Sequence, residues 1–161
     1  MQYKTTHYDA LIQQYGERKF TKNDIKSFVH RVFSMYERAT VGKERVPAEA
    51  FKDLVDEDIH VDFPDYKIRS RQEFLEWHDW IHDLLLSDDH DIRNIDVSYL
   101  ANGKYQARFD IRWRGECKDG SFTDLNIEQS WIMYESDEHT HPVIEHYVAV
   151  VKDVITASEA N

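Results

Sequence analysis

The first strong pattern along the chain is helical and begins at Thr21. From there to residue 40 the apolar residues return every three or four positions, as on one face of a helix: Ile25, Phe28, Val29, Val32, Phe33 and Tyr36. Thr21 and Asp24 have the spacing of a capping box, in which each side chain bonds the other residue's backbone N–H. The pattern predicts a helix from Thr21 that ends between Thr40 and Gly42.

Two shorter elements follow. Pro47 suits the first turn of a short helix, where no N–H donor is needed, and this helix would bury Phe51, Leu54 and Val55. Apolar and polar residues then alternate from Ile59 to Phe63, which predicts a short strand stopped by Pro64.

A second capping box, formed by Ser70 and Glu73, marks the start of another helix. One face of this helix is apolar and carries Phe74, Trp77, Ile81, Leu84 and Leu85. The opposite face carries Glu76, Asp79 and Asp83, so we expect it to meet solvent.

The period changes to alternation after the polar run Ser87–Asp91, which we interpret as a solvated turn. Glycine-containing turns at Asn102-Gly103 and Asp119-Gly120, and a loop over 136–141, divide the rest of the chain. Four long strands are predicted: Ile92–Leu100, Lys104–Cys117, Ser121–Tyr134 and Pro142–Val154.

The register of these strands follows from keeping apolar side chains on one face, because a slip of one residue turns the whole set outward. This condition sets the following opposite pairs: Val97 with Ala107, Ile95 with Phe109, Ile111 with Ile127, Phe109 with Gln129, His146 with Trp131 and Ile144 with Met133. The other face then carries a mixed-charge set: Arg108, Asp110, Arg112, Arg114, Asn126 and Glu128.

Length and composition fit one domain. The 161 residues, of which 41% are hydrophobic, support a single core over 21–155, with 1–20 as an N-terminal arm or short helix and 156–161 as a tail. The net charge of −11 disfavours nucleic acid and anionic membranes as partners. No stretch has the ~20 apolar residues of a membrane helix, and the first residues lack the order of a secretory signal, so we expect a cytoplasmic protein.

The order helix, helix, short strand, helix and four long strands resembles the nuclear transport factor 2-like superfamily, also called SnoaL-like. Local sequence agrees: the segment 54–64, LVDEDIHVDFP, resembles the family's "lf.dDv.v..P", and HDIRN from His90, followed by Val97 and Ala107, resembles its "H.i.N..V....A". The resemblance implies an α+β fold with a cone-shaped curved sheet, mixed or antiparallel, wrapped around three N-terminal helices. It does not fix an activity, because this fold carries isomerases, dehydratases, cyclases, oxygenase subunits and binding proteins.

The catalytic positions of known members of this superfamily can be compared with the residues of this sequence. The ketosteroid isomerases have a catalytic aspartate where this chain has Phe63, and a tyrosine in the first helix where it has Val29 and Val32, with Tyr36 a turn away. That chemistry is therefore disfavoured. The scytalone- and bile-acid-type dehydratases are more similar at one point, because their pocket histidine aligns with His90, while their helix-one tyrosine and aspartate pair has no clear match here.

Three of the nine histidines are candidates for acid/base catalysis. His78 lies in the apolar stripe of its helix, His146 lies on the inward face by register, and His90 follows from the resemblance. With Tyr36 they would supply proton donors and acceptors. Residues that would line the substrate pocket are Trp77, Trp113, Trp131, Gln129 and Phe63. Each histidine could equally be a neutral structural residue, and the tryptophans could fill the core completely.

Metal and cofactor patterns are weak. His78 and His82 stand one helical turn apart without an evident third ligand, and the pair His139 and His141 and the run Asp88–Asp91 lack the spacing of a known site. Phosphate loops, nucleophile elbows and cysteine pairs are absent, and the single cysteine is Cys117. We expect no metal and no cofactor.

Three functions stay open. The first is a small-molecule enzyme of SnoaL-like type that dehydrates, isomerises or cyclises an apolar or aromatic substrate. The second is a non-catalytic ligand-binding or interaction domain, and the third is a structural small subunit of an oxygenase. The resemblance also implies a homodimer through the outer sheet face, where we expect Ile132, Tyr134, Val143 and Tyr147.

Overall fold

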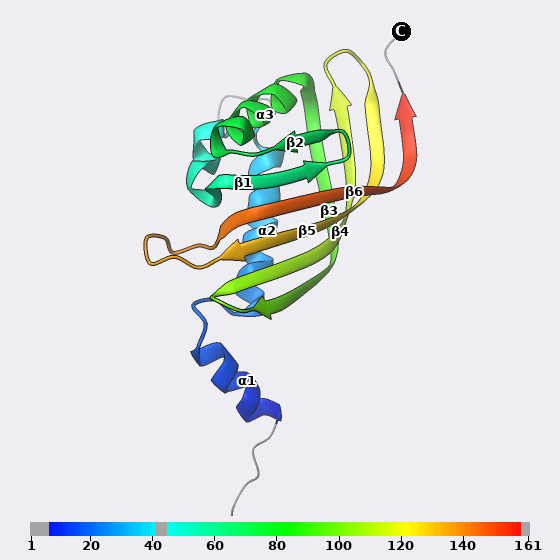
Figure 1. Ribbon diagram of the computed structural model, residues 1–161. Coiled ribbons are helices and arrows are strands. Elements are labelled where there is room, and N and C mark those ends of the chain that lie inside the picture. Colours follow the sequence, from blue (N-terminus) through cyan, green and yellow to red (C-terminus); the bar gives the residue numbers. More distant parts are fainter. Residues whose placement is uncertain (1–6, 41–44, 159–161) are drawn as a thin grey trace, which may run out of the picture.

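The computed structural model describes residues 7–40 and 45–158 and has one face of a single curved sheet covered by helices (Figure 1). The helices are α1 (His7–Gly16), α2 (Lys22–Glu37), the 3-10 helix η1 (Ala48–Leu54) and α3 (Arg71–Leu84). The strands are β1 (Val55–Phe63), β2 (Tyr66–Ile68), β3 (Leu85–Leu100), β4 (Lys104–Cys117), β5 (Phe122–Tyr134) and β6 (Val143–Ser158). Residues 1–6 of the predicted arm and 159–161 of the predicted tail lie outside the described residues.

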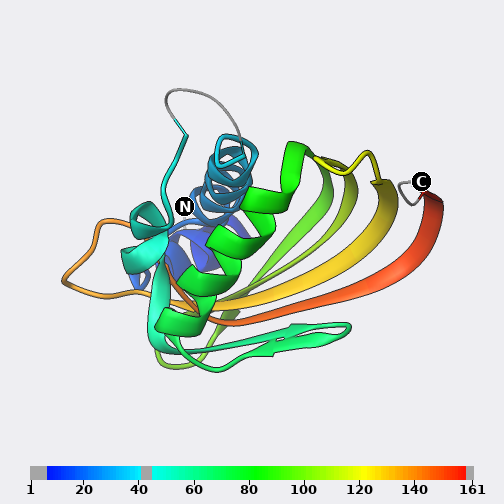
Figure 2. The same ribbon diagram turned by 90° about the horizontal axis from the view of Figure 1, so that it is seen from above.

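The strands form a mixed sheet in the order β2-β1-β6-β5-β4-β3. Only the pairing of β1 with β6 is parallel among the described strands, and the sheet is open between β2 and β3. The sheet curves strongly, and α2 and α3 lie in its concave face (Figure 2). This is the predicted α+β cone, and the core fills the space between these helices and the sheet.

The two capping boxes differ in detail. At α2 both hydrogen bonds are present, because Thr21 N–H donates to Asp24 and Asp24 N–H donates to the Thr21 hydroxyl. At α3, Glu73 N–H donates to Ser70, but the Glu73 carboxylate accepts from the backbone N–H of Arg69 instead of Ser70. The helix α2 ends at Glu37, a few residues before the predicted boundary.

The N-terminal segment is held by Arg18 at one end of the sheet. The guanidinium lies over the rings of Tyr99 and Tyr105 and donates to the carbonyls of Leu100 and Lys104. The short helix α1 precedes this anchor and extends away from the sheet (Figure 1). None of the described helices is long and apolar enough to cross a membrane.

The polar run before the second half of the chain is a strand, so its interpretation as a turn was wrong. The strand β3 begins at Leu85, directly after α3. Within the run the side chains alternate: Asp88 and His90 line a cavity on the concave side, while Asp89 forms an ion pair with Arg114 on the neighbouring strand. A strand can carry a polar run when one face meets a cavity and the other meets opposite charges.

Most of the predicted register is confirmed. Val97 is opposite Ala107, Ile111 is opposite Ile127, and Phe109 is opposite Gln129. Ile95 is not opposite Phe109, because β3 has an extra residue between Arg93 and Asp96. Asn94 there has φ 56°, a left-handed conformation that asparagine tolerates better than most residues.

A second bulge changes the inward face of β6. Ile144 is opposite Met133 as predicted, but β6 has one extra residue next to it, so Tyr147 and not His146 lies opposite Trp131. Tyr147 is therefore buried in the interior and His146 lies on the outer face. Val143 is opposite Tyr134 and so shares its face as predicted, although its side chain is buried.

Candidate active site

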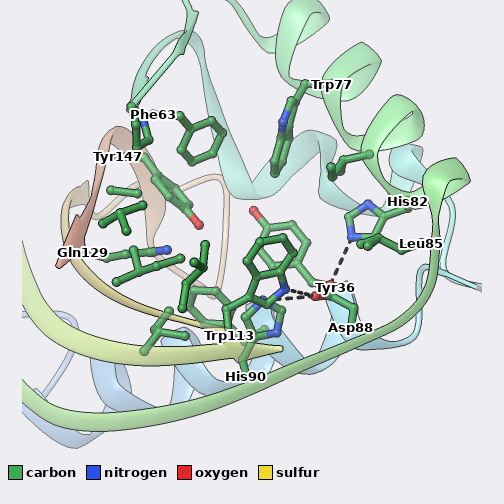
Figure 3. A pocket seen from close by; sticks show the side chains of 18 residues that line it. Tyr36, Phe63, Trp77, His82, Leu85, Asp88, His90, Trp113, Gln129 and Tyr147 are labelled. Carbon is green, nitrogen blue, oxygen red and sulfur yellow. Dashed lines mark hydrogen bonds and ion pairs between the residues drawn. The ribbon is translucent and has the colours of Figure 1, made fainter. Parts of the chain in front are cut away.

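A cavity of about 220 Å³ lies between α3, the end of α2 and the concave face of β3–β6 (Figure 3). Most of its wall is apolar, with the aromatic residues Phe33, Phe63, Trp77 and Trp113 and aliphatic residues of β4–β6. This volume lies below the ~300 Å³ of sites for drug-sized ligands, which favours a molecule of about one ring. The polar residues of the wall are Tyr36, His82, Asp88, His90, Gln129 and Tyr147.

Asp88 is the centre of the polar part of this wall. Its side chain is only 4% exposed, and its carboxylate lies between two imidazoles. The Nε2 atom of His82 is 3.5 Å from one carboxylate oxygen, and the Nε2 atom of His90 is 3.5 Å from the other. Trp113 Nε1 also donates a hydrogen bond to this carboxylate. Two imidazoles thus share one carboxylate beside the cavity.

The surroundings of Asp88 keep it ionised. Burial acts to raise the pKa of this carboxyl group. The hydrogen bond with His82, the neighbouring His90 and the Trp113 donor together outweigh burial and leave the pKa lowered. Asp88 is therefore a carboxylate at neutral pH, able to stabilise a positive charge on either imidazole.

The cavity also offers neutral hydrogen-bond donors. The hydroxyl groups of Tyr36 and Tyr147 both point into it (Figure 3). Burial raises the pKa of Tyr36 well above its usual value of 10.0, and it also raises the pKa of Tyr147. Gln129 accepts a hydrogen bond of 3.0 Å from Trp131 through its amide oxygen, so its NH₂ group remains able to donate.

Six of the nine residues predicted for the site line the cavity: Tyr36, Phe63, Trp77, His90, Trp113 and Gln129. The other three, His78, Trp131 and His146, lie elsewhere.

His78 faces the interior, as its helical position predicts, but it lies behind His82. The two ring centroids are 4.1 Å apart, and the His78 backbone carbonyl accepts from His82 Nδ1 at 2.7 Å. His78 is fully buried, and neither of its ring nitrogens bonds a residue that the structure describes. Burial, with a smaller contribution from His82, lowers the pKa of His78 to about 3. The side chain is a neutral packing group.

His146 lies on the convex side of the sheet. Its Nε2 atom is 3.1 Å from an Asp62 carboxylate oxygen, and Arg69 binds the other oxygen of the same carboxylate. The bulge in β6 moved this residue by one position, which in a strand means the opposite face. His146 therefore cannot act in the cavity.

Trp131 is inside the core and fully buried. It packs against Phe33 and Tyr147, which lie between it and the ligand space, with ring centroids 5.4 and 4.8 Å away. Its indole supports the cavity wall from behind.

Sequence reasoning missed three residues of the site: His82, Asp88 and Tyr147. For two of these residues the spacing in the sequence offered a signal. His82 follows Phe74 and His78 at intervals of four, and these three residues are the buried stripe of α3, while Leu84 of the predicted face is 43% exposed. Asp88 is two residues from His90, so in a strand both share one face. Tyr147 had no such signal, because its direction depends on the bulge.

Among residues 7–40 and 45–158 there is no group of three or more His, Cys, Asp or Glu side chains arranged to hold a metal ion.

Comparison with solved structures shows the fold. A nuclear transport factor 2-like superfamily protein from Salmonella enterica matches with a TM-score of 0.70 and 13% identity, covering 87% of this chain and 96% of its own. A proposed scytalone dehydratase from Novosphingobium aromaticivorans has a TM-score of 0.66 and 13% identity, covering 86% and 95%. The type 2 hexachlorocyclohexane dehydrochlorinase LinA has a TM-score of 0.63 and 8% identity, covering 86% and 94%.

These likenesses establish that the chain has the nuclear transport factor 2-like fold, also called cystatin-like. No protein-family model matches the sequence, and no curated protein is significantly similar to it.

Proposed function

We propose that the protein is a cofactor-independent enzyme that performs acid/base chemistry on a small, uncharged, largely apolar molecule. The observation that carries this proposal is the buried Asp88 carboxylate shared by the Nε2 atoms of His82 and His90 in the cavity wall. An imidazole that is paired with a carboxylate can take up and return a proton near neutral pH, which is the requirement for general acid/base catalysis.

The cavity supports an elimination or isomerisation of a cyclic substrate that carries an oxygen. In this scheme the cluster of His82, Asp88 and His90 accepts a proton from a substrate carbon, and the C–H electron pair forms a double bond. Tyr36, Tyr147 and the Gln129 amide donate to the substrate oxygen, where negative charge develops. In a dehydration the neighbouring C–O bond breaks and the leaving hydroxyl takes up the proton that the cluster removed, so that water is released. In an isomerisation the same proton returns to another carbon of the substrate.

The residues of the cavity wall and the names of similar structures support an elimination or isomerisation. Phe63, Trp77 and Trp113 offer flat apolar surfaces for a ring. Two proteins with the same fold are named for eliminations, a proposed dehydratase and a dehydrochlorinase. At identities of 13% and 8% these names support the reaction class and do not indicate a substrate.

The test is a turnover screen with the full chain. Small cyclic hydroxyketones, enones and alkyl halides are incubated with the protein in D₂O, and ¹H NMR follows loss of water or halide and deuterium uptake next to the carbonyl. Asp88→Asn is expected to lower the rate of an active pair by roughly 10²–10⁴-fold, as the loss of acid/base assistance does. His146→Ala, on the outer face, should leave the rate unchanged.

The opposite pattern would reject the proposal. If compounds bind in the cavity but none reacts, or if Asp88→Asn reacts as fast as the unchanged protein, the cavity is a binding site and the second function considered from the sequence is favoured.

We further propose a cytoplasmic homodimer that does not bind nucleic acid. The net charge of −11 supports the last point, because a phosphate backbone would be repelled.

A further inference from the structure

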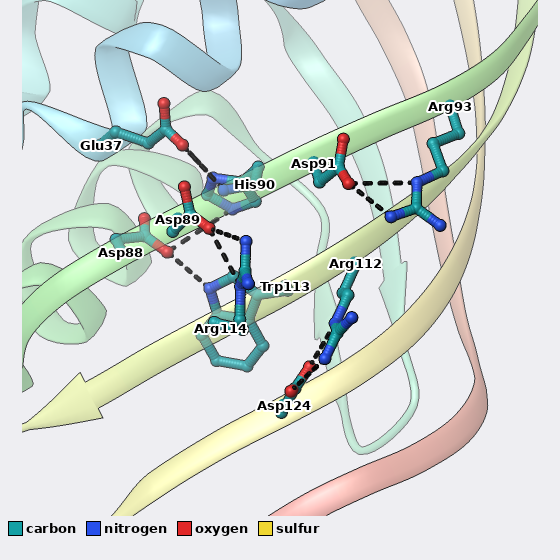
Figure 4. Close-up of polar contacts among 10 residues, drawn as sticks. All are labelled: Glu37, Asp88, Asp89, His90, Asp91, Arg93, Arg112, Trp113, Arg114 and Asp124. Atoms are coloured by element: carbon teal, nitrogen blue, oxygen red, sulfur yellow. Dashed lines mark hydrogen bonds and ion pairs between the residues drawn. The ribbon is translucent and has the colours of Figure 1, made fainter.

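The polar row of the cavity does not end at His90. The Nδ1 atom of His90 is 3.5 Å from the Glu37 carboxylate, and the same Glu37 oxygen accepts the His90 backbone N–H at 2.7 Å (Figure 4). His82, Asp88, His90 and Glu37 thus form a continuous row that passes from α3 across β3 to the last residue of α2. We infer that Glu37 is the proton outlet of the catalytic row, carrying protons between His90 and solvent.

Exposure rises along this row. The His82 and Asp88 side chains are 2% and 4% exposed, His90 is 10% exposed, and Glu37 is 32% exposed. Glu37 is therefore the only member of the row with substantial access to water. The backbone N–H of His90 fixes one of its oxygens next to the imidazole, so its contact with His90 is maintained by the main chain.

A count of protons shows that the row can pass them on. Each of its three contacts joins an imidazole nitrogen to a carboxylate oxygen at 3.5 Å, and a proton placed between the two atoms would make the contact a hydrogen bond. His90 Nδ1 forms no hydrogen bond with a residue that the structure describes. With neutral imidazoles and ionised carboxylates the row has two protons, of which His82 uses one to donate from Nδ1 to the His78 carbonyl. One proton then serves three contacts, so an added proton finds an unfilled position and can shift from contact to contact.

This outlet rests on the proposed function and deepens it. When the leaving group departs without a proton, as a halide does, the base has to release the substrate's proton before the next turnover, and a bound ring would separate the mostly apolar cavity from water. A proton that passes from His90 to Glu37 leaves the row on the other side of the His90 ring. This route therefore stays open while the substrate is bound. Glu37 does not touch the substrate and acts through His90, so it is a positioning residue.

The test needs no substrate. In the full chain labelled with ¹⁵N-histidine, NMR measures the rate at which the His90 imidazole N–H exchanges with water. Glu37→Gln keeps an oxygen that can accept the His90 backbone N–H but cannot carry a proton, and it should slow exchange by roughly tenfold or more. Glu57→Gln, at an exposed position of β1, should not change the rate.

Two further measurements separate transfer from a structural effect. A loosened structure would expose His90 and speed exchange, the opposite of the expected change. In Glu37→Ala, formate should fit the vacated space and restore fast exchange, while chloride at equal ionic strength should not. Unchanged or faster exchange in Glu37→Gln, or equal effects of formate and chloride, would overturn the inference.

The result is distinguishable from that of the turnover screen. Slow exchange in Glu37→Gln together with no reacting substrate would keep the outlet and reject the enzyme. A reaction that needs Asp88 together with unchanged exchange in Glu37→Gln would keep the enzyme and reject the outlet.

Discussion

His78 places an imidazole in the interior with neither ring nitrogen bonded to a described residue. Its imidazole packs against the rings of Phe51 and His82, whose centroids are 4.3 and 4.1 Å from its own. Such a group packs like an apolar side chain while it is neutral, and it resists protonation because a buried charge here has no partner. At the residue scale its consequence is a dependence of stability on pH.

The sign of this dependence follows from the two states. In the unfolded chain His78 titrates near 6.5, and in the folded protein the pKa is lowered to about 3. Between these values only the unfolded chain binds the proton, so the free energy of unfolding falls as the pH falls from 6.5 towards 3. We expect His78 to remove about 2 kcal/mol of stability between pH 7.5 and pH 5.

Urea unfolding at the two pH values measures this effect. His78→Leu should lose about 2 kcal/mol less than the unchanged protein on acidification. His30→Leu, at an exposed position of α2, serves as the control and should follow the unchanged protein. Equal losses in His78→Leu and the unchanged protein would show that His78 is protonated in the folded state.

At the scale of elements, the bulge in β3 depends on the left-handed conformation of Asn94, which has φ 56°. A β-branched residue is strained there, whereas glycine is not. We expect Asn94→Val to lower the free energy of unfolding by about 1–2 kcal/mol and Asn94→Gly to change it by less than about 0.5 kcal/mol. Denaturant unfolding of both variants gives the comparison, and equal stabilities would contradict the assigned conformation.

The two bulges also explain which parts of the sheet could be predicted. Alternation and turn type set the register of Val97, Ile111 and Phe109 with their partners, because a slip would turn apolar residues to solvent. An extra residue leaves the alternation on each side intact and only changes its phase. The apolar pattern alone therefore did not show that Ile95 leaves its expected pair or that Tyr147 replaces His146.

At the scale of the molecule, the strand order favours association of two outer faces. The strands β6 and β5 are central and present Ile132 and Val148, while β1 and β4 flank them. The outer side of β1 carries Asp62, and that of β4 carries Arg108, an exposed side chain with no ion pair to any described residue. A two-fold axis along the strands would place β1 of one copy across β4 of the other, so that opposite charges meet.

This proposed homodimer predicts the effect of a charge reversal. Arg108→Glu should raise the dissociation constant at least ~10-fold, because like charges would then face each other. Arg31→Glu on α2, far from the outer face, is the matched control and should associate as the unchanged chain does. Light scattering over a concentration series measures the mass, and a monomer at micromolar concentration in the unchanged protein would contradict the dimer.

Most elements, their order and most of the register could be predicted from the sequence, since caps, turns and apolar periods are local signals that act over a few residues. The short strand β2 was not predicted. The sequence also placed six of nine proposed residues around the cavity.

The arrangement of the polar residues in the site depends on tertiary packing. The joining of His82, Asp88, His90 and Glu37 takes residues from α3, β3 and α2, and it depends on how these elements pack against one another. Distances between side chains of different elements follow from packing, and packing depends on all the elements at once. For that reason a run of aspartates that looks like a solvated turn became the wall of a cavity.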